Sequence, residues 1–273
     1  MSTLRVTLLG TGSSGGIPRA DGDWGQCDPN EPKNRRSRCS LLVQLWKGRE
    51  AGAPQESTTV IIDTAPEFRD QAAAARISHL DGILYSHDHA DQTHGIDDTR
   101  AIVMRMRKRI RVWMDGPTRE TMMRRFGYCF VGEGAYPPIL EDTGTLEPGA
   151  PVVIEGAGGS ITFTPLRQDH GNGVVSLGFR FFDVGYSNDV VALPEETMAA
   201  LGGLKLWIAD ALRRMPHPTH AHLGRTLEWQ AQLKPEQAVL TNMHLDMDYQ
   251  TLLRELPDGV EPGYDGWALD LTV

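Results

Sequence analysis

Hydrophobic and polar residues change their spacing several times along this chain, and each change marks a predicted element. In the first half, short apolar or alternating runs predict strands at residues 4–9, 39–46, 58–62, 82–85 and 111–114. Helical spacing predicts helices at 64–76, 98–108 and 117–126, and Thr64 with Glu67 is a predicted capping box for the first of them. Glycine and proline between 127 and 149 predict a long surface excursion.

The second half alternates strands with helices. Strands are predicted at 152–154, 161–165, 175–182, 204–208, 238–240 and 267–271, and helices at 194–201, 223–233 and 248–256. A strand-rich half followed by alternating units predicts an α/β fold with two sheets and helices outside them. The chain has no internal repeat and no clear linker, so residues 1–273 are predicted to form a single domain.

Composition narrows the class of protein. The formal net charge of −9 argues against sequence-independent binding of nucleic acid, which depends on many lysine and arginine contacts to phosphates. No apolar run approaches the ~20 residues that span a bilayer, and the N-terminus lacks the features of a signal peptide. An odd number of widely spaced cysteines fits a reducing compartment. We therefore expect a cytoplasmic protein with no membrane partner.

The strongest chemical signal is the segment Ser-His-Asp-His-Ala-Asp at 86–91, which directly follows the predicted strand at 82–85. His87 and His89, separated by one residue on an extended loop, can both reach one metal ion, and Asp91 can reach a neighbouring ion. Imidazole and carboxylate are suitable ligands for zinc and similar divalent metals. A solvated polar loop is the alternative, but three alternating ligand-type residues at the end of a strand favour a metal site.

This motif resembles the signature of the metallo-β-lactamase superfamily. Other elements of the family pattern follow in the same order, with Asp63 after the predicted strand at 58–62, His170 in Gln-Asp-His-Gly, Asp189 in Tyr-Ser-Asn-Asp and His244 in Thr-Asn-Met-His. The segments 10–18 and 32–40 are similar to the phosphoribosyl cyclic phosphodiesterase (PhnP-type) branch. The resemblance covers nearly the whole chain, and it implies a four-layer αββα sandwich.

The resemblance also implies roles for these residues. The chain would bind two divalent metal ions, zinc or manganese, with His87, His89 and His170 on the first, Asp91 and His244 on the second, and Asp189 bridging the two. Asp63 would orient the ligand loop from behind. A metal-bound hydroxide would attack phosphorus, and His220 would protonate the leaving alkoxide as a general acid. Asp91 and His220 are therefore the predicted catalytic residues.

Two departures from the family pattern affect the metals. The pattern is His-x-His-x-Asp-His, but its last position here is Gln92. A carboxamide oxygen is a weaker ligand for zinc than imidazole, so the second site is expected to be weakened, empty or filled by a harder metal such as manganese. His94 could replace the missing imidazole only if the loop rearranged. Near the N-terminus only Cys27 remains of a cysteine cluster that many members use for a structural zinc, so we expect that zinc to be absent.

Other residues keep two interpretations. Arg35, Arg36 and Arg38 could clamp a phosphate, but they could equally pair with carboxylates or loop carbonyls. Asp210 ends a predicted strand, where it could support the metal ligands or simply cap the backbone. His94 is expected in a supporting or surface role.

The leading functional hypothesis is hydrolysis of a small phosphodiester, perhaps cyclic, by a phosphoric diester hydrolase. Hydrolysis of a thioester, a lactone or an RNA phosphodiester is the alternative on the same fold, and the acidic chain argues against RNA. A non-catalytic metal-binding protein is a third hypothesis, motivated by Gln92. The expected partner is a small phosphorylated substrate, and the family resemblance implies a homodimer.

Overall fold

The computed structural model describes residues Met1–Val273, which form two compact units. The first unit comprises Met1–Leu9, Ser40–Phe163 and Gly266–Val273, and the second comprises Gly10–Cys39 and Thr164–Asp265. Each unit is therefore assembled from segments that are distant in sequence. The single domain predicted for 1–273 stays a prediction.

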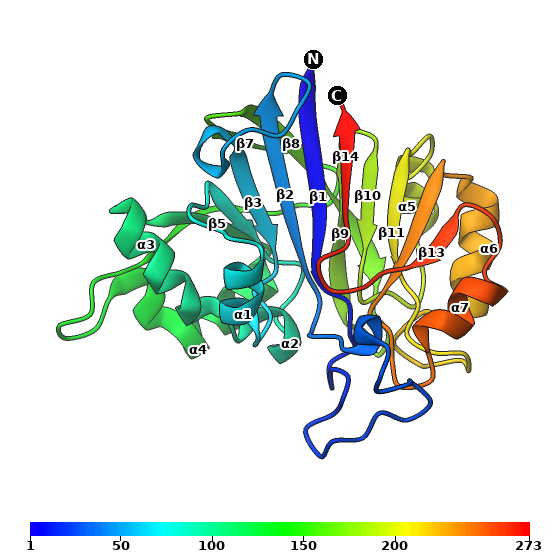
Figure 1. The fold of residues 1–273 in the computed structure, drawn as a ribbon. Helices are drawn as coiled ribbons and strands as arrows, with labels where there is room; N and C mark the ends of the chain where they lie inside the picture. The colour runs from blue at the N-terminus through cyan, green and yellow to red at the C-terminus, as the bar shows by residue number, and fades with distance from the viewer. The chain divides into compact units, whose positions relative to one another are not determined.

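The first unit contains a seven-stranded sheet with the order β14-β1-β2-β3-β4-β5-β6 (Figure 1). β1 pairs antiparallel with β14, and β2 pairs antiparallel with β3, whereas β3 to β6 run parallel. Parallel strands end at the same edge of a sheet, which brings the residues that follow β3 and β4 together. The strands are β1 (Ser2–Gly10), β2 (Ser40–Lys47), β3 (Thr58–Ile62), β4 (Gly82–Leu84), β5 (Ile110–Met114), β6 (Leu140–Thr145) and β14 (Ala268–Thr272).

Helices cover this sheet through an apolar core. Phe68, Ile102 and Met122 from three helices pack with Ile61 and Ile83 of the strands, and all five side chains are buried. Figure 1 shows α3 and α4 beside β5. The helical elements are η2 (Pro54–Glu56), α1 (Phe68–Ala74), α2 (Ala90–Thr93), η3 (Ile96–Thr99), α3 (Arg100–Met106) and α4 (Gly116–Val131).

A second seven-stranded sheet has the order β13-β12-β11-β10-β9-β8-β7. β10 to β13 run parallel, while β9 pairs antiparallel with both β8 and β10. Four of the loops that follow its strands carry predicted site residues, after β8, β10, β11 and β12. The strands are β7 (Val152–Gly156), β8 (Gly159–Asp169), β9 (Val175–Phe181), β10 (Val184–Ser187), β11 (Leu206–Asp210), β12 (Gln237–Thr241) and β13 (Val260–Pro262).

The core of the second unit joins these strands to three α-helices. Trp207 and Leu240 of the sheet pack with Leu201, Trp229 and Leu252 from the helical side, all of them buried. Figure 1 shows α6 and α7 beside β13. The helices are α5 (Glu195–Ala200), α6 (Leu223–Leu233) and α7 (Tyr249–Glu255), and the N-terminal segment adds the short η1 (Pro32–Asn34).

Most predicted elements are present, with α6 matching its predicted bounds of 223–233. The prediction for 127–149 is wrong, because α4 continues to Val131 and β6 occupies Leu140–Thr145. β6 is polar and mostly exposed, and it borders only β5, so it lacks the apolar alternation that marks a strand. β10 and β13 were also missed; they have four and three residues. No helix is both long and apolar enough to cross a membrane.

The capping box predicted for Thr64 is also wrong. α1 begins at Phe68, and the Thr64 hydroxyl instead lies 2.8 Å from the Tyr85 hydroxyl. Both hydroxyls are buried, so each needs a partner inside the protein. Thr64 therefore contributes to the packing of the sheet and not to the start of the helix.

The carboxylate of Asp265 forms hydrogen bonds with two segments of the second unit near the N-terminus. Removing this carboxylate is expected to destabilise the fold. One carboxylate oxygen accepts hydrogen bonds from the N–H and hydroxyl of Thr11 at 2.9 Å, and the other accepts from the N–H and hydroxyl of Ser37 at 2.7 and 2.6 Å. Because an unsatisfied buried donor costs roughly 1–3 kcal/mol, we expect Asp265→Ala to lower the free energy of unfolding by about 3 kcal/mol in urea titrations.

Asp270→Ala is the matched control for this prediction. Asp270 pairs with Arg5 at 2.7 Å on the exposed surface of β14 and β1, and exposed pairs contribute about 0–1 kcal/mol. Equal destabilisation by the two variants would show that the hydrogen bonds of Asp265 have no special importance.

Candidate metal centre

The histidine motif lies on the loop between β4 and α2. β4 ends at Leu84, and α2 begins at Ala90 with His89 as its N-cap. The rings of His87 and His89 have centroids 4.5 Å apart in an edge-to-face arrangement, and their ligand nitrogens lie within 4.8 Å of each other. This separation suits two imidazoles that bind one metal ion.

Asp63 orders this loop from the end of β3. Its carboxylate accepts hydrogen bonds from the Ser86 N–H at 2.8 Å and from the Ser86 hydroxyl at 2.7 Å. The same hydroxyl oxygen lies 3.0 Å from His87 Nδ1. Because its hydrogen points to Asp63, the oxygen accepts from Nδ1–H, and the Nε2 lone pair of His87 becomes the metal-binding one. Burial raises the pKa of Asp63 to about 8, although the Ser86 hydrogen bonds act in the opposite direction.

These contacts support the orienting role predicted for Asp63. Sequence reasoning missed Ser86, although its position directly before the histidine motif was a usable signal. A hydroxyl at that position can accept from the neighbouring imidazole and donate to the carboxylate at the same time.

Gln92 stands where the family pattern has its third histidine. Its side chain is buried, and Nε2 donates to Asp91 Oδ2 at 3.3 Å. The amide nitrogen of Gln92 therefore faces Asp91. His94 does not replace it, because its ring packs edge-on against Phe126 with centroids 5.5 Å apart. This contact favours the supporting or surface role for His94.

His170 follows β8 directly, and its imidazole is hydrogen-bonded to a backbone carbonyl group. Its Nδ1 lies 2.8 Å from the carbonyl oxygen of Thr219, which can only accept, so Nδ1 carries the proton and Nε2 the lone pair. Gly171 gives the chain room here: its φ is +80°, and a Cβ would meet the Pro218 oxygen at 2.4 Å. The buried His170 imidazole is therefore presented in the tautomer that binds a metal through Nε2.

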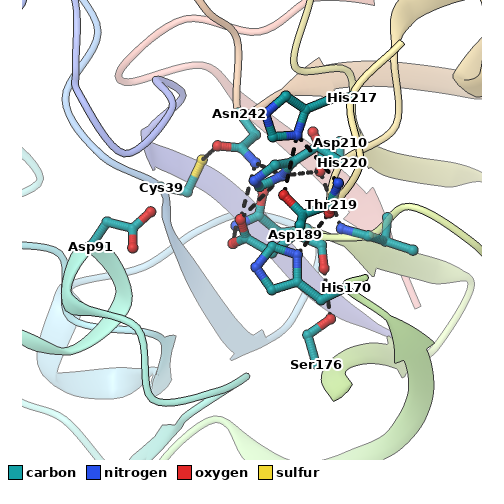
Figure 2. Close-up of polar contacts among 12 residues, drawn as sticks. Cys39, Asp91, His170, Ser176, Asp189, Asp210, His217, Thr219, His220 and Asn242 are labelled. Atoms are coloured by element: carbon teal, nitrogen blue, oxygen red, sulfur yellow. Dashed lines mark hydrogen bonds and ion pairs between the residues drawn. The ribbon is translucent and has the colours of Figure 1, made fainter. Parts of the chain in front are cut away.

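Asp189 follows β10 and lies at the centre of the polar cluster of the second unit (Figure 2). It is buried and has a φ of +51°, an unusual value for a non-glycine residue. Asn188 Nδ2 and Asn242 Nδ2 donate to its two carboxylate oxygens at 2.7 and 3.2 Å. The ligand atoms of His170, Asp189 and His220 lie within 4.8 Å of one another.

His220 reaches this cluster from the loop before α6. Its Nδ1 lies 3.0 Å from Asp210 Oδ2 and 3.5 Å from Asp189 Oδ1. Asp210 ends β11, is fully buried, and also accepts from the Val190 N–H at 3.1 Å. A carboxylate on Nδ1 fixes the ring and directs Nε2 outward. Of the two interpretations of Asp210, the structure favours support of a site residue over plain capping.

His244 is not among the residues whose ligand atoms gather around Asp189, and its role as a ligand of the second metal stays a prediction. Asn242, not His244, follows β12 in the position beside Asp189, and its Nδ2 also lies 3.2 Å from His220 Nδ1. Asn242 has a φ of +60°, a left-handed conformation that asparagine tolerates, and this turn leads the next residues away from the cluster. His244 instead contacts Arg19 through Nε2. The family resemblance implied a ligand role for His244 and gave no role to Asn242.

The arginines of the N-terminal segment have structural contacts. Arg36 is 1% exposed, and its guanidinium lies against the thiol of Cys27, with NH1 3.9 Å from Sγ. Arg35 stacks over the ring of Trp24 at 5.4 Å. For both residues the structural interpretation is favoured over a phosphate clamp. Cys27 itself packs with Ile17 in a small apolar cluster, and the predicted absence of a structural zinc stays a prediction.

The donors of each unit suit a divalent metal. In the first unit, His87 presents Nε2 because its Nδ1 is hydrogen-bonded. In the second unit, His170 presents Nε2 in the same way, and Asp189 supplies a buried carboxylate. The predicted second set fits less well, because Asp91 has the amide of Gln92 beside it and Asp189 has that of Asn242. Amide oxygens suit harder ions than zinc.

Comparison with known proteins agrees with this fold. A family model described as "Beta-lactamase superfamily domain" matches residues 58–243, more than half of the chain. The crystal structure of a new diphosphatase from the PhnP family is 29% identical, with a TM-score of 0.86 over 99% of this chain and 98% of that one. Zn²⁺-bound PqqB from Methylobacterium extorquens is 13% identical, with a TM-score of 0.73 over 98% and 100% of the two chains, and shows the fold alone.

A curated protein also matches. An octanoyltransferase from Porphyromonas gingivalis (strain ATCC BAA-308 / W83) is 28% identical over 267 residues, which are 96% of this chain and 51% of that protein. The chain thus spans about half the length of the curated relative that it matches. The predicted αββα metallo-β-lactamase fold and the PhnP-like resemblance are confirmed, and family and neighbours indicate a hydrolase of this fold. From residues 58–243 and the fold around them, the chain belongs to the β-lactamase superfamily domain family.

Proposed function

We propose that this chain is a metal-dependent phosphodiesterase acting on a small phosphorylated substrate, with a cyclic phosphodiester as the first candidate. The observation that carries the proposal is the buried cluster of His170, Asp189 and His220, whose ligand atoms lie within 4.8 Å, with Asp210 behind His220 at 3.0 Å. The likeness to a PhnP-family diphosphatase at 29% identity supports phosphoryl chemistry over the other reactions of the fold.

The proposed ligands are residues of both units. His87, His89 and Asp91 belong to the first unit, and His170 and Asp189 belong to the second. When bound, divalent metal ions supply activation of water and neutralise charge on phosphoryl oxygens. Asp63 and Ser86 hold His87 in its metal-binding tautomer.

His220 is proposed as the proton donor. Asp210 accepts the Nδ1–H of His220, which leaves Nε2 to pass a proton to the oxygen that departs from phosphorus. The buried carboxylate also stabilises the imidazolium that must exist before this transfer. The chain's own contribution is therefore to orient the ligands and to hold the proton at Nε2.

The two amides set the metal preference in this proposal. Gln92 and Asn242 place carboxamides beside Asp91 and Asp189, so a second ion would have oxygen-rich surroundings. Manganese accepts such ligands more readily than zinc does. We propose that the second ion binds more weakly than the first and that manganese supports more activity than zinc.

Metal content and activity measured on one sample test this function. The protein would be purified without chelator, analysed for metals, and assayed on bis(p-nitrophenyl) phosphate and on a cyclic nucleotide, with zinc or manganese added. We expect at least one ion per chain and phosphodiester hydrolysis that rises with manganese. Metal-free protein, together with no hydrolysis after either addition, would overturn the proposal.

Measurements on the same samples distinguish two alternative functions from the proposed one. Because Gln92 replaces the imidazole of the family pattern with an amide, and Asn242 places a second amide beside Asp189, a non-catalytic metal-binding protein is the second candidate. One tightly bound ion with no hydrolysis of any substrate would favour it. The name of the octanoyltransferase relative adds an acyl substrate to the assay, and hydrolysis of an octanoyl thioester without phosphodiester hydrolysis would favour that class.

A further inference from the structure

A groove on the helical side of the first unit carries three arginines that have no acidic partner. The groove has a volume of about 480 Å³ and lies between α1, η3, α3 and the short η2. Its volume is within the range of ligand-binding sites. None of the residues proposed above as metal ligands lines it, so what binds there is independent of the proposed function.

The first wall of the groove is one face of α1 and of the turn that ends this helix. Arg69, Ala72, Ala73 and Arg76 have the spacing i, i+3, i+4 and i+7, which places them along one stripe. The stripe has an arginine at each end and two small apolar residues between them. It therefore combines an apolar surface with positive charge on both sides of it.

The second wall is formed by α3. Ala101 and Ile102 continue the apolar floor, and Arg105 lies one turn beyond Ala101 on the same side of the helix. Ala101 and Arg105 are exposed, whereas Ile102 is buried. Because the distance between packed helices depends on the side chains at their contact, small residues on both walls allow another helix to approach closely.

The charge of the groove is not neutralised within the protein. Arg69, Arg76 and Arg105 are exposed, and none of them forms a hydrogen bond or an ion pair through its side chain. Asp98 is the one acidic residue that lines the groove, and none of the three arginines pairs with it. The lining residues therefore keep a net positive charge.

Other arginines of the same unit do find acidic partners. Arg100 pairs with Asp97 at 2.6 Å, and Arg119 pairs with Asp142 at 2.9 Å. The turn after α3 instead adds three exposed cations without an ion pair, which are Arg107, Lys108 and Arg109. In a chain with a net charge of −9, so many unpaired cations in one place indicate that this surface meets an anionic partner.

We propose that this groove binds an acidic amphipathic helix of a partner protein. The apolar face of that helix packs on the alanines, and its carboxylates pair with Arg69, Arg76 and Arg105. Arginine suits this role because its guanidinium group presents paired donors to carboxylate oxygens. The groove has no aromatic side chain on which a base could stack, which favours a helix over a single strand of RNA.

Fluorescence anisotropy with two labelled synthetic peptides tests this inference. Both peptides form an amphipathic helix with leucines on one face, and they differ only in carrying glutamate or glutamine on the other. We expect saturable binding of the glutamate peptide, with a Kd at least about tenfold higher for the Arg69→Ala/Arg76→Ala/Arg105→Ala variant and for the glutamine peptide. No saturable binding of the glutamate peptide, or equal Kd values for wild type and variant, would overturn the inference.

Two further variants separate the groove from general electrostatics. Lys205→Ala/Arg225→Ala/Arg254→Ala removes the same charge from the second unit and should leave the Kd of the glutamate peptide unchanged. Ala101→Gln adds an uncharged side chain to the floor and should raise this Kd at least about threefold. An equal loss in the first variant, or no change in the second, would overturn the inference. Thermal melting of each variant shows whether it remains folded.

Two other occupants of the groove would be recognised by parallel measurements. Tighter binding of oligouridylate than of the glutamate peptide, lost in the variant without the three arginines, would assign the groove to nucleic acid. Sedimentation that shows a dimer for wild type and a monomer for this variant would assign it to a second copy of the chain. Either result would overturn the inference.

Discussion

Asp189→Ala is expected to reduce kcat for phosphodiester hydrolysis by about 1000-fold or more, the largest loss of any single substitution proposed here. The buried carboxylate is held by Asn188 and Asn242 and lies with His170 and His220 in one cluster. Its removal takes away a proposed ligand and one of the two carboxylates near His220 Nδ1. Metal content should fall in the same variant, which elemental analysis would show.

Asp183→Ala is the matched control for this variant. Asp183 lies in the turn between β9 and β10 and forms an exposed pair with Lys205 at 3.4 Å, so its removal should leave kcat and metal content unchanged. If Asp189→Ala retained a tenth of wild-type activity, the dinuclear assignment of this carboxylate would be refuted.

His220→Ala is expected to have the second largest effect, a loss of about 100-fold in kcat. The loss should be greatest for substrates with alkoxide leaving groups and smaller for p-nitrophenolate, which departs without a proton. Asp210→Asn should cause a smaller loss of kcat, because the variant keeps the His220 ring but weakens the contact at Nδ1 that orients it. Rates for the two leaving groups, measured side by side, would reveal this difference.

Metal analysis of the same variant decides between two roles for His220. A proton donor can be removed without loss of metal, whereas the short separation of its ligand atoms from those of His170 and Asp189 also suits a ligand. We expect unchanged metal content. His222→Ala is the control, since His222 makes no side-chain capping bond at the start of α6 and should retain activity. Loss of metal in His220→Ala would show that His220 is a metal ligand.

The sequence pattern alone indicated the histidine motif, because His87 and His89 come shortly after the buried strand β4. His170 and Asp189 were assigned from the family resemblance. His170 follows β8, whereas β10, which precedes Asp189, was not predicted. The tautomers of His87 and His170 could not be foreseen, because they depend on a neighbouring hydroxyl and on a carbonyl 49 residues away.

The surroundings of His244 depend on the local backbone. Asn242 and His244 are two residues apart, and Asn242, with a φ of +60°, is the one that contacts Asp189. The family resemblance implied a ligand role for His244, whereas the structure shows its contact with Arg19. Neither contact could be predicted from the sequence, because each depends on the path of the backbone after β12.

Individual strands were not predicted where their residues show little apolar pattern. β6 at Leu140–Thr145 is mostly exposed, and its place in the sheet depends on hydrogen bonds to β5. Such a strand is defined by its neighbour, so its own residues do not predict it. An α/β fold with two sheets was nevertheless predictable, because the buried strands β3, β4, β11 and β12 carry apolar runs. The family resemblance implied the αββα order of its layers.

The pairing of β1 with β14 has a consequence for engineering of the chain. Ser2 N–H donates to the Val273 carbonyl at 2.8 Å, and Val273 N–H donates to the Ser2 carbonyl at 3.0 Å, so the first and last residues lie side by side in one sheet. A short flexible linker can join them without displacing either strand. Circular permutation, with new ends in the exposed turn between β2 and β3, would preserve every strand pairing. Tags or surface attachments could then be placed at the new ends instead of beside β1 and β14.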